Sequence, residues 1–202
     1  MTASIQVSPA SGCPAAVLAD QRVITPDHWG FDGEIHTGHL EIHQSVVEEV
    51  ASFFDVARDL HYPIERVVPA SALAWNDPHL MAANCSSGFN YRTVAGKTTM
   101  SLHAFGLAFD INPRVLPFLH MDNGMVVTEP PGAAYDTGHP GSIASGHPLV
   151  AHMESLGWTW GGTWTIEDQG LIDYQHFEKR LTSDERNRLL AGYELPPAAR
   201  LG

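Results

Sequence analysis

One amphipathic segment constrains the fold of this chain more than any other part of the sequence. Between Ser45 and His61, apolar side chains recur at intervals of three and four residues: Val46, Val47, Val50, Phe53, Phe54, Ala57 and Leu60. This spacing predicts a helix with one apolar face, and Ser45 and Glu48 stand in capping-box positions at its start. Because such a face must be buried, we expect the helix to pack on a sheet.

Four other segments predict the strands of that sheet. HLEIHQS (39–45) alternates before the helix, IERVVPA (64–70) follows it, GLAFDIN (106–112) predicts a buried strand that Pro113 ends, and DYQHFEK (173–179) predicts a further strand. Strands and helices do not alternate in the regular manner of parallel βαβ units. The sequence therefore predicts an α+β fold with a small, mainly antiparallel sheet flanked by helices.

Two shorter helices and several irregular stretches complete the expected organisation. HPLVAHMESLG (147–157) predicts a helix closed by glycine, and TSDERNRLLAGYELPP (182–197) predicts one with Thr182 and Glu185 in capping-box positions. Residues 117–146 are rich in proline and glycine and predict a long irregular excursion. We expect an extended N-terminal arm over 1–25, one domain over 26–195 and a tail over 196–202.

Composition narrows the class of protein. The 202 residues include 11 Lys and Arg against 23 Asp and Glu, and the net charge of −12 disfavours a nucleic-acid surface. We find no apolar run long enough to span a membrane and no signal-peptide pattern at the start. Cys13 and Cys85 leave one bridge or two free thiols open, and free thiols are favoured.

Two pairs of polar residues interrupt apolar segments. His103 and Asp110 stand seven apart in SLHAFGLAFD, and Asp173 and His176 interrupt the strand pattern of IDYQHFE. Taken alone, each could be a hydrogen-bonded structural residue. A catalytic zinc requires three N or O ligands and a carboxylate nearby that takes a proton from water. The four residues can meet this need if the second strand bends or ends between Asp173 and His176, because those positions otherwise face opposite sides.

The same segments resemble a known family. SLHAFGLAFD has the form S-x-H-x-x-G-x-A-x-D and DYQHFE the form [DE]-x-x-H, the two signatures of the zinc D-alanyl-D-alanine carboxypeptidases and L-alanyl-D-glutamate endopeptidases that cut peptidoglycan stem peptides. GFDG, HTGHLEIH, FNYR, DINP and LGWTWGGTW also appear in the family's order, so the resemblance covers roughly residues 30–180. It implies the Hedgehog/DD-peptidase fold.

The resemblance implies a role for each residue of the motifs. One Zn²⁺ per chain would be bound by His103, Asp110 and His176, with Asp173 as general base, a position where many relatives carry Glu. Arg92 of FNYR would stabilise the developing oxyanion or hold a substrate carboxylate.

Three further residues are candidates for substrate binding. Ser101 would hydrogen-bond the substrate or stabilise the turn before the first histidine, and Trp160 and Trp164 would form a substrate wall or belong to the core. Four other histidines are expected to be ordinary surface or structural residues: His120, His139, His147 and His152.

Three functions remain open at this point. The sequence favours an endolysin-type L-alanyl-D-glutamate endopeptidase that acts as a monomer on stem peptides of the bacterial cell wall, without nucleic-acid or membrane partners. Its origin would be a phage, with release at lysis, or a bacterium, with an export signal absent from this sequence. The alternatives are a D-alanyl-D-alanine carboxypeptidase and a non-catalytic, zinc-stabilised wall-binding module.

Overall fold

The computed structural model describes residues 12–94, 97–193 and 195. Its helices are α1 (Ala15–Ala19), α2 (Val47–Asp59), α3 (Asp77–Ala82), α4 (Pro148–Ser155), α5 (Ile166–Gln169) and α6 (Ser183–Gly192). Short 3₁₀ turns are η1 (Gln44–Val46), η2 (Ala70–Leu73), η3 (Leu102–Phe105) and η4 (Gly161–Thr163). The strands are β1 (Gln21–Ile24), β2 (Asp27–Trp29), β3 (Ile35–Thr37), β4 (Leu40–His43), β5 (Arg66–Val67), β6 (Cys85–Ser86), β7 (Ala108–Asp110), β8 (Phe118–Asp122), β9 (Met125–Glu129), β10 (Trp158–Trp160), β11 (Leu171–Asp173) and β12 (His176–Lys179).

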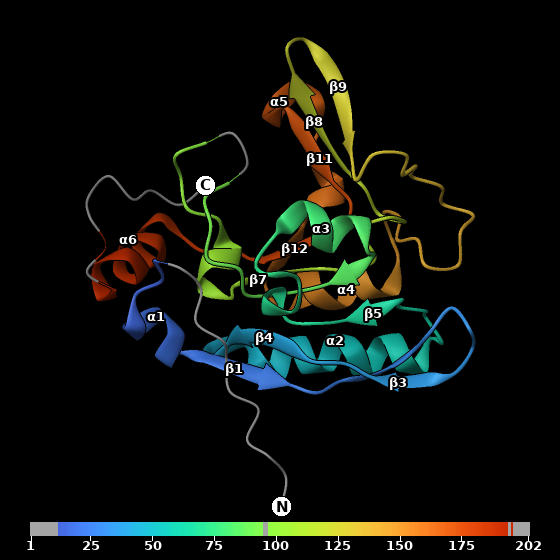
Figure 1. Cartoon of the computed structure of the whole chain (residues 1–202), viewed down its shortest axis with the longest axis horizontal. Coiled ribbons are helices and arrows are strands. Elements are labelled where there is room, and N and C mark those ends of the chain that lie inside the picture. The colour runs from blue at the N-terminus through green and yellow to red at the C-terminus, as the bar shows by residue number, and fades with distance from the viewer. Residues whose placement is uncertain (1–11, 95–96, 194, 196–202) are drawn as a thin grey trace, which may run out of the picture.

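Several small sheets share the molecule (Figure 1). Strands β10, β12 and β7 form one antiparallel sheet, and β11, β8 and β9 form another. The pairs β1–β4 and β2–β3 are antiparallel, whereas β5 and β6 are parallel. The predicted α+β class with mainly antiparallel pairing is confirmed, and in the described residues no helix is long and apolar enough to cross a membrane.

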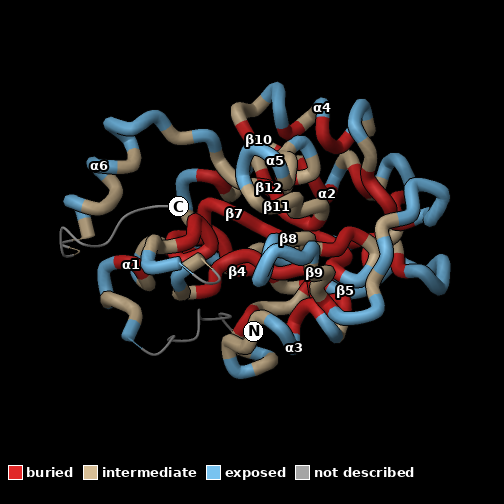
Figure 2. Tube along the Cα trace, turned by 90° about the horizontal axis from the view of Figure 1, so that it is seen from above, coloured by how far each residue is buried: buried red, intermediate tan, exposed pale blue. Residues whose placement is uncertain are grey.

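The core lies where α2 packs on the β7–β12 pair. Phe109 and Phe177 are cross-strand partners whose rings stack at 5.3 Å, and Phe53 of α2 meets these rings at 5.1 and 5.4 Å. Each is fully buried, and burying one such ring stabilises the fold by roughly 1.5–3 kcal/mol. Figure 2 shows the buried residues concentrated along β4, β7 and β10 and the exposed ones along α6 and the outer loops. The helix-on-sheet prediction is thus confirmed.

The predicted capping box at the start of α2 is wrong. The chain first makes the 3₁₀ turn η1, so the residue that precedes α2 is Val46, which makes no side-chain cap bond. Ser45 lies inside this turn, where its backbone N–H donates to His43 Nδ1 at 3.1 Å. The capping box predicted at Thr182 and Glu185 is present at the start of α6.

The predicted N-terminal arm is too long. Residues 12–25 belong to the fold, because Val17 of α1 is fully buried in the core and β1 pairs with β4 along its whole length. The folded domain therefore includes residues before the expected boundary at residue 26. Residues 1–11 and the predicted tail at 196–202 lie outside the described residues. Both cysteines are free thiols, as favoured.

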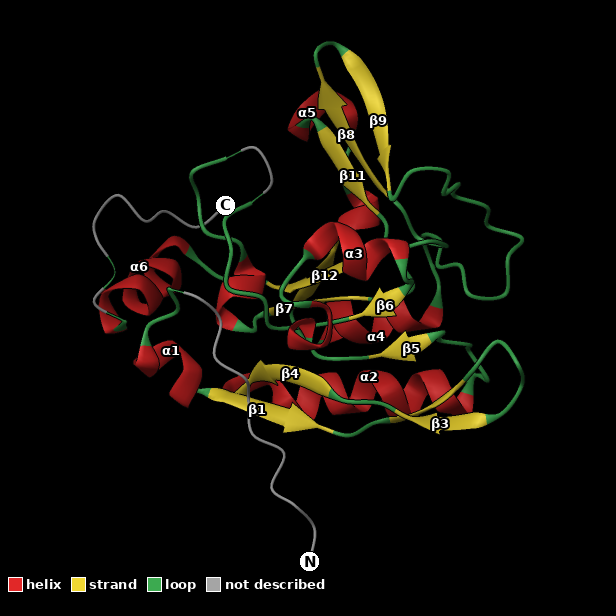
Figure 3. Ribbon diagram, in the orientation of Figure 1, coloured by secondary structure: helices red, strands yellow, loops and turns green. Residues whose placement is uncertain are grey.

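The predicted irregular excursion over 117–146 contains a β-hairpin. Strands β8 and β9 are joined by Asn123 and Gly124, both with positive φ (48° and 80°). Asn-Gly is the commonest signal for such a two-residue turn, and the sequence analysis overlooked it. The hairpin and β11 project from the body of the molecule, at the top of Figure 3. Residues 130–146 are irregular as predicted.

Candidate metal centre

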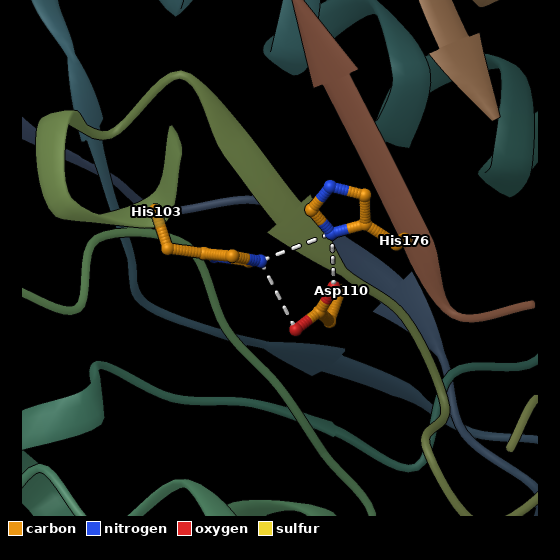
Figure 4. A group of neighbouring side chains, drawn as sticks. All are labelled: His103, Asp110 and His176. Atoms are coloured by element: carbon orange, nitrogen blue, oxygen red, sulfur yellow. Dashed lines mark hydrogen bonds and ion pairs between the residues drawn. The ribbon is translucent and has the colours of Figure 1, made fainter. Parts of the chain in front are cut away.

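Strand pairing brings the two sequence motifs together. His176, the first residue of β12, lies directly opposite Asp110, the last residue of β7. His103 comes from η3, which precedes β7, and the three side chains point toward one another (Figure 4). All three residues are buried, with exposed fractions of 2% for His103 and 7% for each of the others.

The turn that carries His103 is built from local signals. Ser101 caps η3, and its Oγ accepts a hydrogen bond from the His103 backbone N–H at 3.2 Å. Gly106 ends η3 with φ of +66°, where a Cβ atom would collide with the Gln21 side chain and the His43 backbone. Glycine is therefore required at this position of the motif.

The side chains of His103, Asp110 and His176 form a tight triangle, in which each histidine faces a different Asp110 oxygen. His103 Nε2 lies 3.1 Å from His176 Nδ1 and 3.3 Å from Asp110 Oδ2, and His176 Nδ1 lies 3.0 Å from Asp110 Oδ1. His103 Nδ1 donates to the Gly88 carbonyl at 2.7 Å, and this hydrogen bond orients the ring so that Nε2 faces the triangle. This group could hold a metal ion.

The chain changes sheets between Asp173 and His176. Asp173 ends β11, the Tyr174 backbone N–H donates to the Pro117 carbonyl, and β12 begins at His176. The single strand predicted over 173–179 is thus broken by the bend that the two side chains require. Asp173 and the three clustered residues line one cavity of about 490 Å³.

Burial dominates the electrostatics of Asp173. Asp173 is partly exposed as a residue, but its Oδ1 atom is buried and has no hydrogen-bond partner in the described structure. Burial raises the pKa of this carboxyl from 3.8 to about 7. Such a group accepts a proton near neutral pH.

The clustered ligands are perturbed in other directions. Burial would raise the pKa of Asp110, but the charges and hydrogen bonds of His103 and His176 outweigh it and hold this pKa well below its usual range. Burial alone would lower the pKa of His176, but the hydrogen bonds that its ring donates to the Asp110 and Glu178 carboxylates raise this pKa well above its ordinary value.

Comparison with known proteins agrees with this chemistry. Residues 95–179 match the model of a family described as D-alanyl-D-alanine carboxypeptidase. No curated protein and no solved structure gives a significant match. The matched range contains both motifs and supports a hydrolase of the peptidase class.

Arg92 lines the cavity of this candidate peptidase, but part of its guanidinium is already engaged. Its Nη2 pairs with Asp77 Oδ2 at 2.9 Å, and its buried Nε atom has no hydrogen-bond partner. Burial raises the pKa of Asp173, and the positive charge of Arg92 partly offsets this effect by lowering the same pKa. Arg92 is therefore held near the centre by Asp77.

Two of the three substrate-binding candidates line the cavity, and the third is buried in the core. Ser101 and Trp164 line the cavity, and the Trp164 ring lies 5.5 Å from the His176 ring. Trp160 does not: it is 2% exposed, and its Nε1 donates to the Tyr174 carbonyl at 2.8 Å. Of the two roles left open for Trp160, substrate wall or core, the structure supports the core, since alternation along β10 turns this side chain inward; its inclusion among the substrate-binding candidates is corrected.

Two residues of the site were missed from the sequence. Glu178 Oε2 lies 3.2 Å from His176 Nε2, on the side of the ring away from the triangle. Its position two residues after His176 in a strand places both side chains on one face, and this signal could have revealed it. Asp77, the partner of Arg92, follows no motif, and only the tertiary structure identifies it.

Proposed function

We propose that this chain is a zinc-dependent peptidase that hydrolyses peptidoglycan stem peptides at the bacterial cell wall. The observation that carries the proposal is the buried triangle of His103, Asp110 and His176 beside the unpaired carboxylate oxygen of Asp173 in one cavity. A non-catalytic wall-binding module would have no need of that carboxylate, so the enzyme is favoured.

The donor set fits zinc. Two imidazole nitrogens and one carboxylate are typical protein ligands of a catalytic Zn²⁺, which keeps its fourth position open. With bonds of about 2.0–2.1 Å, two ligands of a tetrahedral zinc lie about 3.3 Å apart. The distance of 3.1 Å between His103 Nε2 and His176 Nδ1 is close to this value, and each of these nitrogens has one Asp110 oxygen within 3.0–3.3 Å. Glu178 would orient His176 from behind, as carboxylates often do for metal-bound histidines.

The residues of the chain would share the work of hydrolysis. Zinc bound at the triangle would supply Lewis acidity to the attacking water and to the scissile carbonyl. Asp173 would accept the proton of the attacking water at a carboxylate oxygen and pass it to the departing amine. Arg92, held by Asp77, would neutralise the charge that develops on the carbonyl oxygen or hold a substrate carboxylate. Ser101 and Trp164 would contact the peptide.

Among the stem-peptide bonds we favour the one between L-alanine and D-glutamate, because the aspartate of DYQHFE is common in the endopeptidase branch that the sequence resembles. The description of the matched family favours the alternative, cleavage between two D-alanines. We further propose that the protein acts as a monomer, of the endolysin type.

Mass spectrometry of fragments released from purified sacculi tests these proposals. The zinc-loaded protein should release fragments with a new N-terminal D-glutamate or D-isoglutamine, whereas free D-alanine would indicate the carboxypeptidase. A chelator should abolish release of whichever product is formed, and readdition of zinc should restore it. Full activity of the chelated protein would refute the zinc mechanism, and zinc binding without any product would favour the binding module.

A further inference from the structure

The cavity extends from the metal centre along one face of the β11–β8–β9 sheet. Asp173 lies opposite Phe118, and Phe118 lies opposite Glu129. Directly opposed residues share a face, so these side chains form a row across the sheet. All three line the cavity. Because neighbouring strands are about 4.8 Å apart, Glu129 stands about 10 Å from Asp173.

A second row lies on the same face, two residues further along each strand. It consists of Leu171, His120 and Val127. The His120 ring stacks on Phe118 with centroids 4.9 Å apart, and its Nε2 lies 3.2 Å from Glu129 Oε1. Phe118 and His120 therefore hold the Glu129 carboxylate in one place on this face.

The two rows combine an apolar floor with one anionic end. Phe118 and Leu171 supply apolar surface between Asp173 and the outer strand, and the Glu129 side chain retains 34% of its exposure. The His120 ring engages only Oε1 of Glu129, and a carboxylate has a second oxygen that can accept a further hydrogen bond. A side chain of several methylene groups with a terminal ammonium matches this arrangement, since it covers apolar surface and keeps its charge at the end.

We propose that Glu129, oriented by His120, binds the side-chain ammonium group of a diamino acid residue in the peptide substrate. This inference rests on the proposed function. An extended peptide advances about 3.3–3.6 Å per residue, so one residue and a lysine-length side chain span about 10 Å. A stem peptide carries lysine or diaminopimelate one residue away from either candidate bond. Glu129 thus selects stem peptides whose side-chain amine is free over those in which it is acylated by a cross-link.

Two matched peptides test this selection. One stem peptide carries a free side-chain amine, and the other carries the same amine acetylated. The zinc-loaded wild type should show a KM about tenfold lower for the free amine, the size expected of one charge-assisted hydrogen bond in a partly exposed site. Glu129→Gln should raise that KM about tenfold, leave kcat nearly unchanged and leave the acetylated peptide unaffected. Glu129→Asp should keep part of the preference.

Asp122→Asn is the control, because Asp122 lies on the same face of β8 beyond His120 but outside the cavity lining. This variant should have the same KM and kcat as the wild type for both peptides. The proposed subsite is wrong if Glu129→Gln raises the KM of both peptides equally or of neither. It is also wrong if the wild type has the same KM for both peptides.

Calorimetric binding of the same peptides separates this inference from the proposed function. If the zinc-loaded wild type cleaves neither peptide, the peptidase proposal fails. The subsite then stands if the free-amine peptide binds about tenfold more tightly than the acetylated one and Glu129→Gln removes the difference. Equal binding of both peptides overturns it.

Discussion

Replacing Asp173 by asparagine separates proton transfer from metal binding. Asparagine is close in size and can hydrogen-bond the attacking water, but it cannot accept the water's proton. The zinc-loaded variant should keep its metal while stem-peptide hydrolysis falls about 10²–10⁴-fold, the usual contribution of a positioned general base.

The same substitution has a predictable effect on the stability of the metal-free protein. Burial raises the Asp173 pKa from 3.8 to about 7, so within this pH window the folded protein holds a proton that the unfolded chain has released. The free energy of unfolding therefore falls as pH rises from about 4 to about 7. The full shift corresponds to about 4 kcal/mol, which is the upper limit of the loss, and partial solvent access lowers it toward about 1 kcal/mol. Because asparagine carries no charge, the free energy of unfolding of the variant should not show this fall between about pH 4 and pH 7.

Urea unfolding of chelated wild type and Asp173→Asn at pH 5 and pH 8 measures the effect. The variant should be more stable than the wild type at pH 8, by about 1–4 kcal/mol, and the difference should shrink at pH 5. Zinc stoichiometry and hydrolysis are measured on the same preparations. Loss of zinc from the variant would show that Asp173 is a ligand. Hydrolysis at the wild-type rate would show that another group is the base. Equal stability of variant and wild type at both pH values would contradict the raised pKa of Asp173.

Asp173→Glu provides the intermediate point of the series. It restores the residue of many relatives but lengthens the side chain by one methylene group in a site shaped for aspartate. Hydrolysis should lie above that of the asparagine variant and below wild type, since misplacing a catalytic group by about 1 Å can cost on the order of 10²-fold. Activity no higher than that of the asparagine variant would contradict the expectation that a longer carboxylate still accepts the proton from a displaced position.

Three other predictions concern the metal and the core. His176→Ala should reduce zinc stoichiometry and lower the melting temperature of the zinc-loaded protein, whereas His139→Ala should retain the metal; the reverse result would overturn the ligand set. Glu178→Gln should weaken zinc affinity about 10–100-fold in a competitive chelator titration, and an unchanged affinity would show that Glu178 does not orient His176. Phe109→Ala should cost about 3–5 kcal/mol in urea unfolding, because the ring is fully buried between Phe53 and Phe177, and a loss below 1 kcal/mol would contradict this packing.

Local sequence patterns were sufficient for the elements whose cause is local. The apolar periodicity of α2, the glycine after α4 and the capping box of α6 lie within single turns or helices, and each predicted helix is present. Where a local signal was overlooked, as with Asn-Gly in the β8–β9 hairpin, the prediction failed although the information was in the sequence.

The motifs also named the residues of the candidate centre, but not how they meet. His103 and His176 are 73 residues apart and in contact, because β12 pairs with β7 in the register that sets His176 opposite Asp110. Partner strands so distant in the chain leave no local trace of their register, which depends on how both faces of the sheet are covered.

The sequence by itself determined the residue types of the two motifs, the main helices and the α+β class. Only the tertiary structure decided that the chain changes sheets after Asp173, that Trp160 packs in the core while Trp164 lines the cavity, and that Asp77 holds Arg92. The physical reason is that helix and turn propensities act over a few neighbouring residues. Burial, pKa shifts and cavity walls instead arise from side chains that meet only when distant segments pack together.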